Sequence, residues 1–373
     1  MKGFVISVLL VLSFLLQYCH DASSSIDKMP SNLIINLKWH PAYPQESQAD
    51  VETGLLWVLA YLGESITEKD YLDYMTWIEP NLLQLDLTDL IDDPQKRLLW
   101  KEVLTEIKLE SDDPKHHSVD VGKFVFETFN ESDTYYQLTG MPTDLNAFKS
   151  FYDLDDEYRF SVAKGESCVA FGFRMIGCSQ ANELTELGYI AQEGSGSSIS
   201  DFTAEEFEVF DFMENGQPRF GIYNTEGNLM TGANPEVTIA GKPAKCMWCH
   251  TSQVQPLIFA ATNIDGFETM DSFSTRIHEQ NVMRRRYLRK HNYDFAIDSL
   301  RQHSLAELLY FTYEYPTPQR LASEGIESDM IMSLDYHDNI EYRFFGLEFD
   351  SMVHRYAVDP TFKKSSRETY WEE

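Results

Sequence analysis

The spacing of apolar residues changes twice along this chain, and these changes limit the folds that it can adopt. Between residues 26 and 155, apolar positions recur every three or four residues, the period of a helix with one buried face. Between residues 156 and 240 they alternate with polar positions, as in a half-buried strand. Between residues 241 and 373 the helical period returns. We therefore expect an α+β fold with a helical N-terminal region, a small antiparallel β meander and a helical C-terminal region.

Helix starts in the first region support this division. Residues 67–70 have the form of a capping box, and apolar residues follow at helical spacing. Asp93 precedes Pro94, which is an N-cap followed by a proline in the first helical turn. Residues 120–129 and 144–152 continue the helical pattern more weakly. We expect a helix at each of these places, with packing as the role of its apolar residues.

The central region has the signals of strands joined by tight turns. Residues 158–163 and 169–175 alternate apolar and polar side chains. Two apolar-rich segments, 207–213 and 219–223, flank Asn215-Gly216, which is typical of a hairpin turn. We expect these segments to pair as an antiparallel meander.

Composition excludes several classes of function. The chain has 60 acidic and 30 basic residues among 373, so its formal net charge is -30. Such a chain repels phosphate backbones and anionic lipid surfaces, so we expect no nucleic-acid partner and no peripheral binding to an anionic membrane. The hydrophobic fraction of 43% supports a sizeable folded core. Five cysteines are too few for a disulfide scaffold of this length.

The first 25 residues have the features of an export signal. Lys2 precedes an uninterrupted run of mostly apolar residues, 4–16, which is shorter than the roughly 20 residues that span a bilayer. Cys19 follows this run, and the segment resembles a bacterial lipoprotein signal, in which the cysteine is lipidated. We expect residues 1–25 to be signal and tether, and the protein to be exported to the periplasm or anchored at the outer membrane. Ordinary signal cleavage is the alternative, and the lipid is the only membrane contact expected.

One short motif has the residue types and the spacing of a cofactor-binding site. Residues 246–250 read Cys-Met-Trp-Cys-His, so that Cys246, Cys249 and His250 stand at i, i+3 and i+4 and share one face of a helical turn. The composition of the chain predicts roughly 0.002 such motifs by chance. Two thiols and an imidazole at this spacing can hold one flat cofactor from a single turn.

The motif resembles the haem-attachment motif of c-type cytochromes. The resemblance implies one covalent haem c, with Cys246 and Cys249 bonded to its vinyl groups and His250 as proximal ligand of the iron. It covers the motif and residues 255–257 but not the whole chain, and it marks residues 241–373 as a cytochrome c-like haem-binding region. Haem is attached in exported compartments, in agreement with the signal segment. The implied function is electron transfer between redox partner proteins of the cell envelope.

Two other classes of function stay open. A haem with an open distal face would serve a peroxidase-like enzyme or a haem sensor, whereas a six-coordinate iron favours electron transfer. We expect an electron carrier rather than an enzyme, and name no catalytic residue. A surface binding protein without haem is the third hypothesis.

The cysteines also allow interpretations in which no haem is bound. Cys246 and Cys249 can form a thiol–disulfide redox pair, although such sites follow a strand in a βαβ unit that is not expected here. Zinc held by these two thiols with Cys168 and Cys178 is a further alternative. Cys168 and Cys178 can instead pair with each other in an oxidising compartment.

The second axial ligand of the iron has several candidates, all within a long helix expected over residues 269–291. We prefer Met270, because neighbouring Gly266 and Asp271 suit a loop that can turn back over a haem. Other candidates are His278, Met283 and His291. A shorter helix is expected over residues 304–313.

The expected long helix also carries a basic run in this acidic chain, at residues 284–286 and 289–290. We expect a solvated helix face whose positive charges balance nearby carboxylates. The functional alternative is a clamp for haem propionates or a docking patch for an acidic redox partner.

Overall fold

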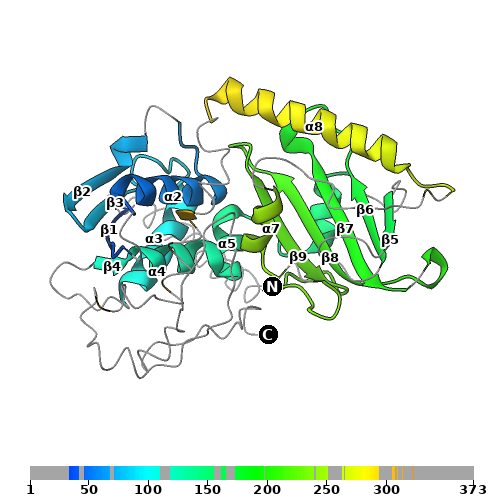
Figure 1. Ribbon diagram of the computed structural model, residues 1–373, viewed down its shortest axis with the longest axis horizontal. Coiled ribbons are helices and arrows are strands. Elements are labelled where there is room, and N and C mark those ends of the chain that lie inside the picture. Colours follow the sequence, from blue (N-terminus) through cyan, green and yellow to red (C-terminus); the bar gives the residue numbers. More distant parts are fainter. Residues whose placement is uncertain are drawn as a thin grey trace, which may run out of the picture.

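The chain combines helices with two β-sheets, which lie side by side in the computed structural model (Figure 1). The fold is therefore mixed α and β, as expected, and one of the two sheets is wholly antiparallel. The residues that the structure describes are 33–41, 46–67, 71–109, 118–154, 161–164, 173–196, 198–238, 241–250, 263 and 265–293, with the single positions 305, 306, 309, 313 and 322. Cys19 and the expected signal segment lie outside these residues, as do Cys168 and most of the helix expected over 304–313.

The first sheet has the strand order β2-β3-β1-β4. Its strands are β1 (Ile34–Lys38), β2 (Met75–Glu79), β3 (Leu82–Asp86) and β4 (Ser118–Asp120). Strand β1 pairs antiparallel with β3 and parallel with β4, while β2 and β3 form an antiparallel pair. Helices α2 (Gln48–Tyr61) and α3 (Pro94–Leu109) pack with this sheet into one core.

Local sequence explains where these two helices begin. The Ser47 hydroxyl and the Asp50 carboxylate form a reciprocal capping box at the start of α2. The Asp93 carboxylate accepts a hydrogen bond of 2.8 Å from the backbone N–H of Gln95, so the cap predicted before Pro94 is confirmed. The apolar positions at the expected spacing face the core, and Val103 and Ile107 are buried.

The helix expected after residues 67–70 is wrong. Tyr71–Tyr74 is a short 3-10 turn, and β2 follows at once. Met75 pairs with Leu85 of β3, and Trp77 pairs with Leu83, so partners on another strand decide the conformation of this segment. The expectation of a helical region over 26–155 is likewise incomplete, because short apolar runs do not distinguish a buried strand from a buried helix.

Four short helical segments lead from the first sheet to the second. They are α4 (Val121–Val125), a π-helical turn (Phe126–Asn130), α5 (Ser132–Thr139) and α6 (Leu145–Phe151). Asp120 caps α4 and Asp144 caps α6, each through its carboxylate. The weak helical patterns over 120–129 and 144–152 are thus confirmed.

The second sheet is a five-stranded meander in which each strand pairs with the next. Its strands are β5 (Ser161–Lys164), β6 (Phe173–Cys178), β7 (Gly188–Ser195), β8 (Thr203–Phe212) and β9 (Pro218–Asn224). The predicted hairpin is confirmed: Gly216, at a φ of +74°, donates from its N–H to the carbonyl of Met213 between β8 and β9. Two of the expected strand segments, 158–163 and 169–175, lie only partly within the described residues.

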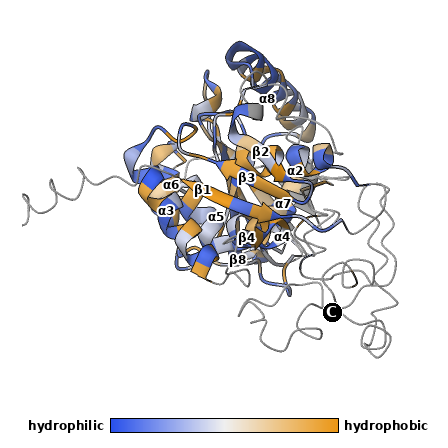
Figure 2. Cartoon of the chain, turned by 90° about the vertical axis from the view of Figure 1, so that its left-hand side faces the viewer, coloured by the Kyte–Doolittle hydropathy of each residue, from blue (hydrophilic) through white to orange (hydrophobic). Residues whose placement is uncertain are grey.

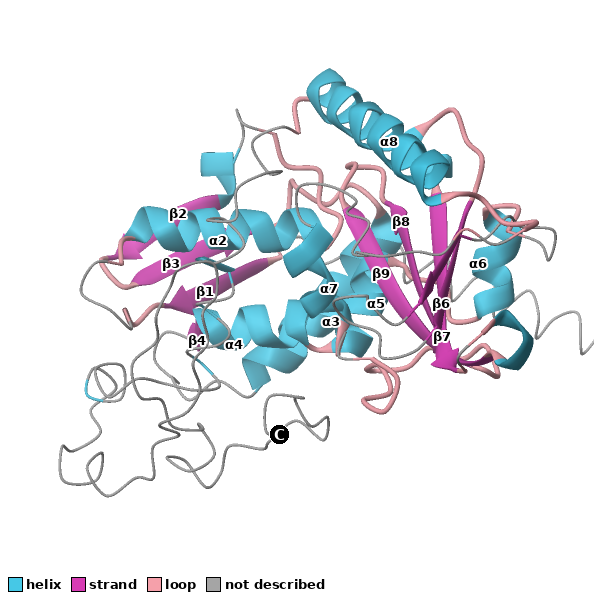
Figure 3. Ribbon diagram, turned by 45° about the vertical axis from the view of Figure 1, so that its right-hand side comes forward, coloured by secondary structure: helices cyan, strands magenta, loops and turns pink. Residues whose placement is uncertain are grey.

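Two helices of the C-terminal region pack on this sheet. Helix α7 (Pro243–His250) lies against β9, and α8 (Met270–His291) crosses one end of the sheet (Figure 3). Thr269 caps α8 through its hydroxyl and Asn292 ends it in a left-handed conformation, so the helix predicted over 269–291 is confirmed. The exposed side of α8 is largely hydrophilic (Figure 2). In the described part of the chain, no helix combines the length and apolar character needed to cross a membrane.

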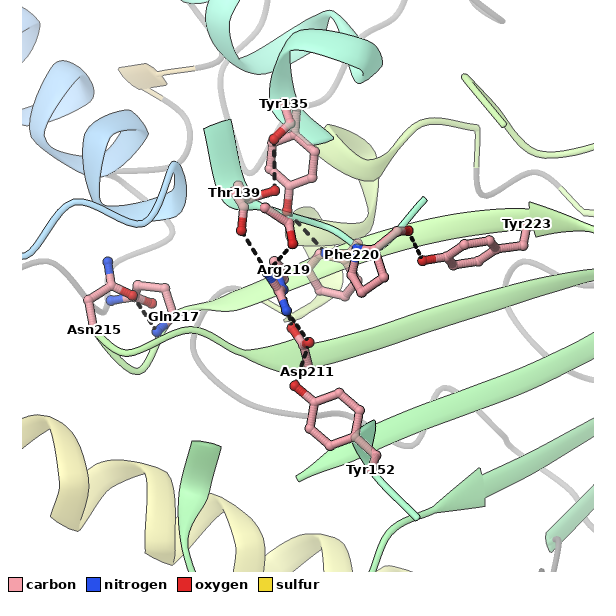
Figure 4. A network of polar contacts seen from close by, with 11 residues as sticks. Tyr135, Thr139, Tyr152, Asp211, Asn215, Gln217, Arg219, Phe220 and Tyr223 are labelled. Carbon is pink, nitrogen blue, oxygen red and sulfur yellow. Dashed lines mark hydrogen bonds and ion pairs between the residues drawn. The ribbon is translucent and has the colours of Figure 1, made fainter. Parts of the chain in front are cut away.

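A buried polar network joins the β8–β9 hairpin to the helices before it (Figure 4). Arg219 donates to the Asp211 carboxylate and to the carbonyls of Thr139 and Gly140. Tyr152 donates to Asp211 at 2.6 Å. The network thus fixes the end of α5 and the end of α6 against the same face of the second sheet.

Candidate functional site

Strand alternation gives the second sheet two chemically different faces. We call one of them the α7 face; it consists of Arg174, Glu193, Glu206, Glu208, Phe210 and Phe220. Their Cα atoms are paired across adjacent strands, and residues two apart on a strand point to the same side. The opposite face carries Asp211 and Arg219 of the network in Figure 4.

The cysteine–histidine motif lies within α7, as the sequence predicts. One helix contains Cys246, Cys249 and His250 at i, i+3 and i+4. Cys246 is half-buried and is not in a disulfide, and its Sγ lies 3.6 Å from the carbonyl oxygen of Lys242 one turn before. The side chains of Trp248 and Cys249 lie outside the described residues. The turn thus has the spacing that attachment of one cofactor through two thiols requires.

His250 packs against two neighbouring aromatic rings of the α7 face. Its ring centroid lies 5.6 Å from that of Phe210 and 5.6 Å from that of Phe220. Burial lowers the pKa of His250 to about 3, and the positive charges of Arg174 and Arg284 lower it further in the same direction. The imidazole is therefore neutral at neutral pH, which is the form that binds a metal.

Next to these aromatic residues, the α7 face carries four buried or half-buried charged side chains. Arg174 of β6 forms ion pairs with Glu193 of β7, at 2.5 Å, and with Glu208 of β8, at 2.9 Å. Glu206 accepts a 2.6 Å hydrogen bond from the backbone N–H of Asn234. Burial raises the pKa of all three carboxyls, to about 8 for Glu193 and about 7 for Glu206. Carboxylic acid forms therefore exist here near neutral pH.

Arg174 connects this cluster to the motif electrostatically. Burial opposes its charge, but Glu193 and Glu208 raise its pKa, and Cys246 adds to that effect. The same guanidinium contributes to the low pKa of His250. The charges of the carboxylate cluster and of α7 are therefore linked through one side chain.

The preferred second ligand does not lie in a loop. Met270 is the first residue of α8, so the loop expected around it is wrong. Its half-buried side chain packs with the cluster that contains Tyr189, Phe212 and Phe273. The hydroxyl of Thr269 decides this, because it accepts a hydrogen bond from the backbone N–H of Ser272 and so caps a helix that starts at Met270.

The other candidate ligands have different surroundings. His278 is exposed on α8, and Met283 is half-buried against the same cluster as Met270. His291 packs between the rings of Tyr287 and Tyr293 at the end of α8. None of these contacts joins them to α7 within the described residues.

The basic run is not one solvated face, which corrects that expectation. Arg284 is only 1% exposed and lies over the ring of Phe212, with its centre 5.8 Å from the ring centroid. It donates to the carbonyl of Gly216 and to the side-chain oxygen of Gln217. Arg286 and Arg289 are exposed as expected. Tertiary packing has thus used one arginine of the run to hold the β8–β9 hairpin.

Cys178 is a buried free thiol at the end of β6, where the side-chain nitrogen of Gln280 lies 3.2 Å from its sulfur. Cys168, with which the sequence allows it to pair, lies outside the described residues. Within the described residues, no group of three or more His, Cys, Asp or Glu side chains has an arrangement that could hold a metal ion.

Sequence reasoning did not select Arg174, Glu193 or Glu206. One signal was present: Glu206 and Glu208 stand four and two positions before Phe210, so that carboxylates share a strand face with core aromatics. A carboxylate on the apolar face of an expected strand indicates a buried charge that needs a partner.

The donor set of α7 fits a covalently attached haem in its chemistry. It combines a thiol at Cys246 with a neutral imidazole at His250, and the cation of Arg174 lies near enough to influence both. Searches against protein-family models, curated proteins and solved structures find no match to this chain.

Proposed function

We propose that this protein binds one haem c covalently through Cys246 and Cys249, with His250 as the proximal ligand of the iron, and carries electrons between redox partner proteins of the cell envelope. The observation that carries the proposal is the spacing of the three residues within α7. Their sequence alone indicates haem attachment. The helix supports this interpretation because side chains at i, i+3 and i+4 project from one side of a turn.

The bound haem would supply an iron that alternates between two oxidation states. The chain's own residues hold the ligand in place. Phe210 and Phe220 pack against the imidazole of His250 from the sheet and limit its rotation. His250 is half-buried, and its low pKa keeps the imidazole neutral, with a lone pair available for the iron.

A haem enzyme or sensor with an open distal face is the second candidate. The placement of Met270 favours it, because this side chain packs in a cluster of its own at the start of α8. A thioether held there has to leave its packing before it can bind iron. Spectra of the haem-loaded protein distinguish the two candidates by the coordination of the iron.

The test of haem attachment is expression of the full chain with a haem-attachment system. We expect haem staining of the protein band on a denaturing gel and a pyridine haemochrome spectrum of a c-type haem. The double variant Cys246→Ala, Cys249→Ala should lose the stain. Cys178→Ala is the matched control, because this thiol is buried elsewhere and should leave the stain intact. Haem that stays covalently bound in the double variant would refute the proposal.

A further inference from the structure

The α7 face holds more negative than positive charge in its polar part. Glu193, Glu206 and Glu208 converge there on one guanidinium, that of Arg174. Glu193 is 0% exposed and Glu206 is 4% exposed. An isolated charge in such surroundings is strongly unfavourable, so a buried carboxylate without a cation binds a proton instead.

Glu206 is the carboxyl with the weakest compensation. Arg174 bonds to Glu193 and Glu208, whereas Glu206 has the backbone N–H of Asn234 on its Oε2 atom. Among the described residues, its buried Oε1 atom has no hydrogen-bond partner. Oxygens of Glu193 and Glu208 also lack a hydrogen-bond partner among the described residues, so each carboxyl of the cluster has an oxygen that can hold a proton.

Glu206 and Glu193 also repel each other. They are directly paired across β7 and β8, the arrangement in which like charges destabilise a sheet. Burial raises the pKa of Glu193, and the negative charge of Glu206 raises it further. The protonation of one carboxyl of the pair therefore favours the charged form of the other.

Among the described residues, a few other charged groups act on the pair. Glu208 lies on the same face of β8, and Thr238 donates a side-chain hydrogen bond to it. Glu205 of the same strand points to the opposite face but still disfavours the charge of Glu206. From α7, Cys246 acts on Arg174, and Arg174 acts on His250.

We propose that Glu193 and Glu206 form a proton-binding pair that takes up a proton from solvent when the haem on α7 is reduced. The inference rests on the proposed function, because it needs a redox centre at Cys246 and His250. A haem held by Cys246 and His250 would take one electron from a reduced redox partner, and the site would then carry one positive charge less. A carboxylate of the pair then becomes a carboxylic acid, so the net charge of the site is restored.

Arg174 is the physical link in this coupling. Its charge acts on both the carboxyl pair and the ligand helix. Loss of one positive charge at the iron makes the surroundings of the pair more negative and favours its protonated form. The burial-raised pKa values of about 7 and about 8 place the exchange near neutral pH.

The first experiment needs no haem. Infrared spectroscopy of the full haem-free chain follows the C=O band of protonated carboxyls as pH is raised from 5 to 9. We expect a band that persists at pH 6 and is lost as pH rises past 8, that Glu206→Gln weakens, and that the double variant Glu193→Gln, Glu206→Gln removes in large part. Glu205→Gln is the matched control, because this neighbour on β8 faces the other way and should leave the band unchanged. A wild type without such a band at pH 6 overturns the proton-binding pair.

The second experiment measures the reduction potential of the haem-loaded protein between pH 5 and 9. If one proton is taken up with each electron, the reduction potential falls by up to about 59 mV for each unit of pH increase around pH 7 to 8. Glu206→Gln should remove most of this slope, and Glu193→Gln, Glu206→Gln should remove it entirely, while Glu205→Gln keeps it. A slope that survives in the double variant refutes the coupling. A chain that holds no covalent haem refutes the proposed function and the coupling together, whereas the infrared band still decides whether the pair binds a proton.

Discussion

Arg219 and Asp211 form a two-pronged ion pair across neighbouring strands of the second sheet (Figure 4). The Nε atom of Arg219 donates to one carboxylate oxygen at 2.7 Å, and the Nη2 atom donates to the other at 2.8 Å. Asp211 is fully buried, and Tyr152 donates to the same carboxylate. Arg219 also donates to the carbonyls of Thr139 and Gly140. This pair therefore connects the helical segments to the hairpin that lies under α7.

Removal of one partner of this pair should destabilise the protein strongly. Arg219→Met leaves the buried Asp211 carboxylate without its cation, which typically costs about 3–5 kcal/mol in the free energy of unfolding. Urea unfolding followed by circular dichroism measures the change. Arg286→Met is the control, because exposed substitutions usually stay within about 0.5 kcal/mol. A loss below about 1 kcal/mol for Arg219→Met would show that the network in Figure 4 does not stabilise the hairpin.

Glu206 should make stability depend on pH. Its pKa is raised by burial from 4.5 to about 7 in the folded chain, so the unfolded chain loses its proton first as pH rises. Stability therefore falls between about pH 4.5 and 7 and stays lower above that range. A difference of this size corresponds to about 3 kcal/mol. Glu206→Gln should thus be more stable than wild type by about this amount at pH 8, and equally stable at pH 4.

Urea unfolding of the haem-free chain at both pH values checks this prediction. Glu205→Gln, on the same strand but the other face, should follow the wild-type pH dependence. Equal stability of wild type and Glu206→Gln at pH 8 contradicts a proton on the buried carboxyl.

Met270 decides between a six-coordinate and an open haem. A thioether ligand raises the reduction potential and produces a weak sulfur-to-iron charge-transfer band in the far red. If Met270 binds iron, Met270→Ala should remove the band and lower the potential while the covalent haem stays. Met283→Ala is the comparison, since this second candidate packs against the same cluster, and loss of the band in that variant instead would assign the ligand to Met283. A wild type that lacks the band and binds carbon monoxide freely has an open distal face, and Met270 is then a packing residue.

Cys19 tests the proposed location of the protein. A lipid on this cysteine holds an exported chain to a membrane without spanning it. Cys19→Ser should therefore move the protein from the membrane fraction to the soluble fraction of the cell envelope, as an immunoblot of the two fractions shows. A distribution that does not change with the substitution contradicts the lipid anchor and favours ordinary signal cleavage.

Sequence patterns predicted those elements of the fold that a few neighbouring residues determine. The cap at Asp93, the hairpin at Asn215-Gly216 and the start of the helix at Thr269 each depend on a few contiguous residues. The motif of α7 belongs to the same class, because two thiols and an imidazole must share one turn. The haem itself and the export of the chain stay predictions.

Contacts between distant segments decided the rest. Met75 entered a strand because β3 was there to pair with it, and Arg284 became buried because the β8–β9 hairpin covers it. Strand pairing brought Arg174, Glu193 and Glu206 together from three strands. Their identities are visible in the sequence, but their protonation is not. A carboxyl group's pKa depends on how much water and which charges surround it, and only the folded chain sets both.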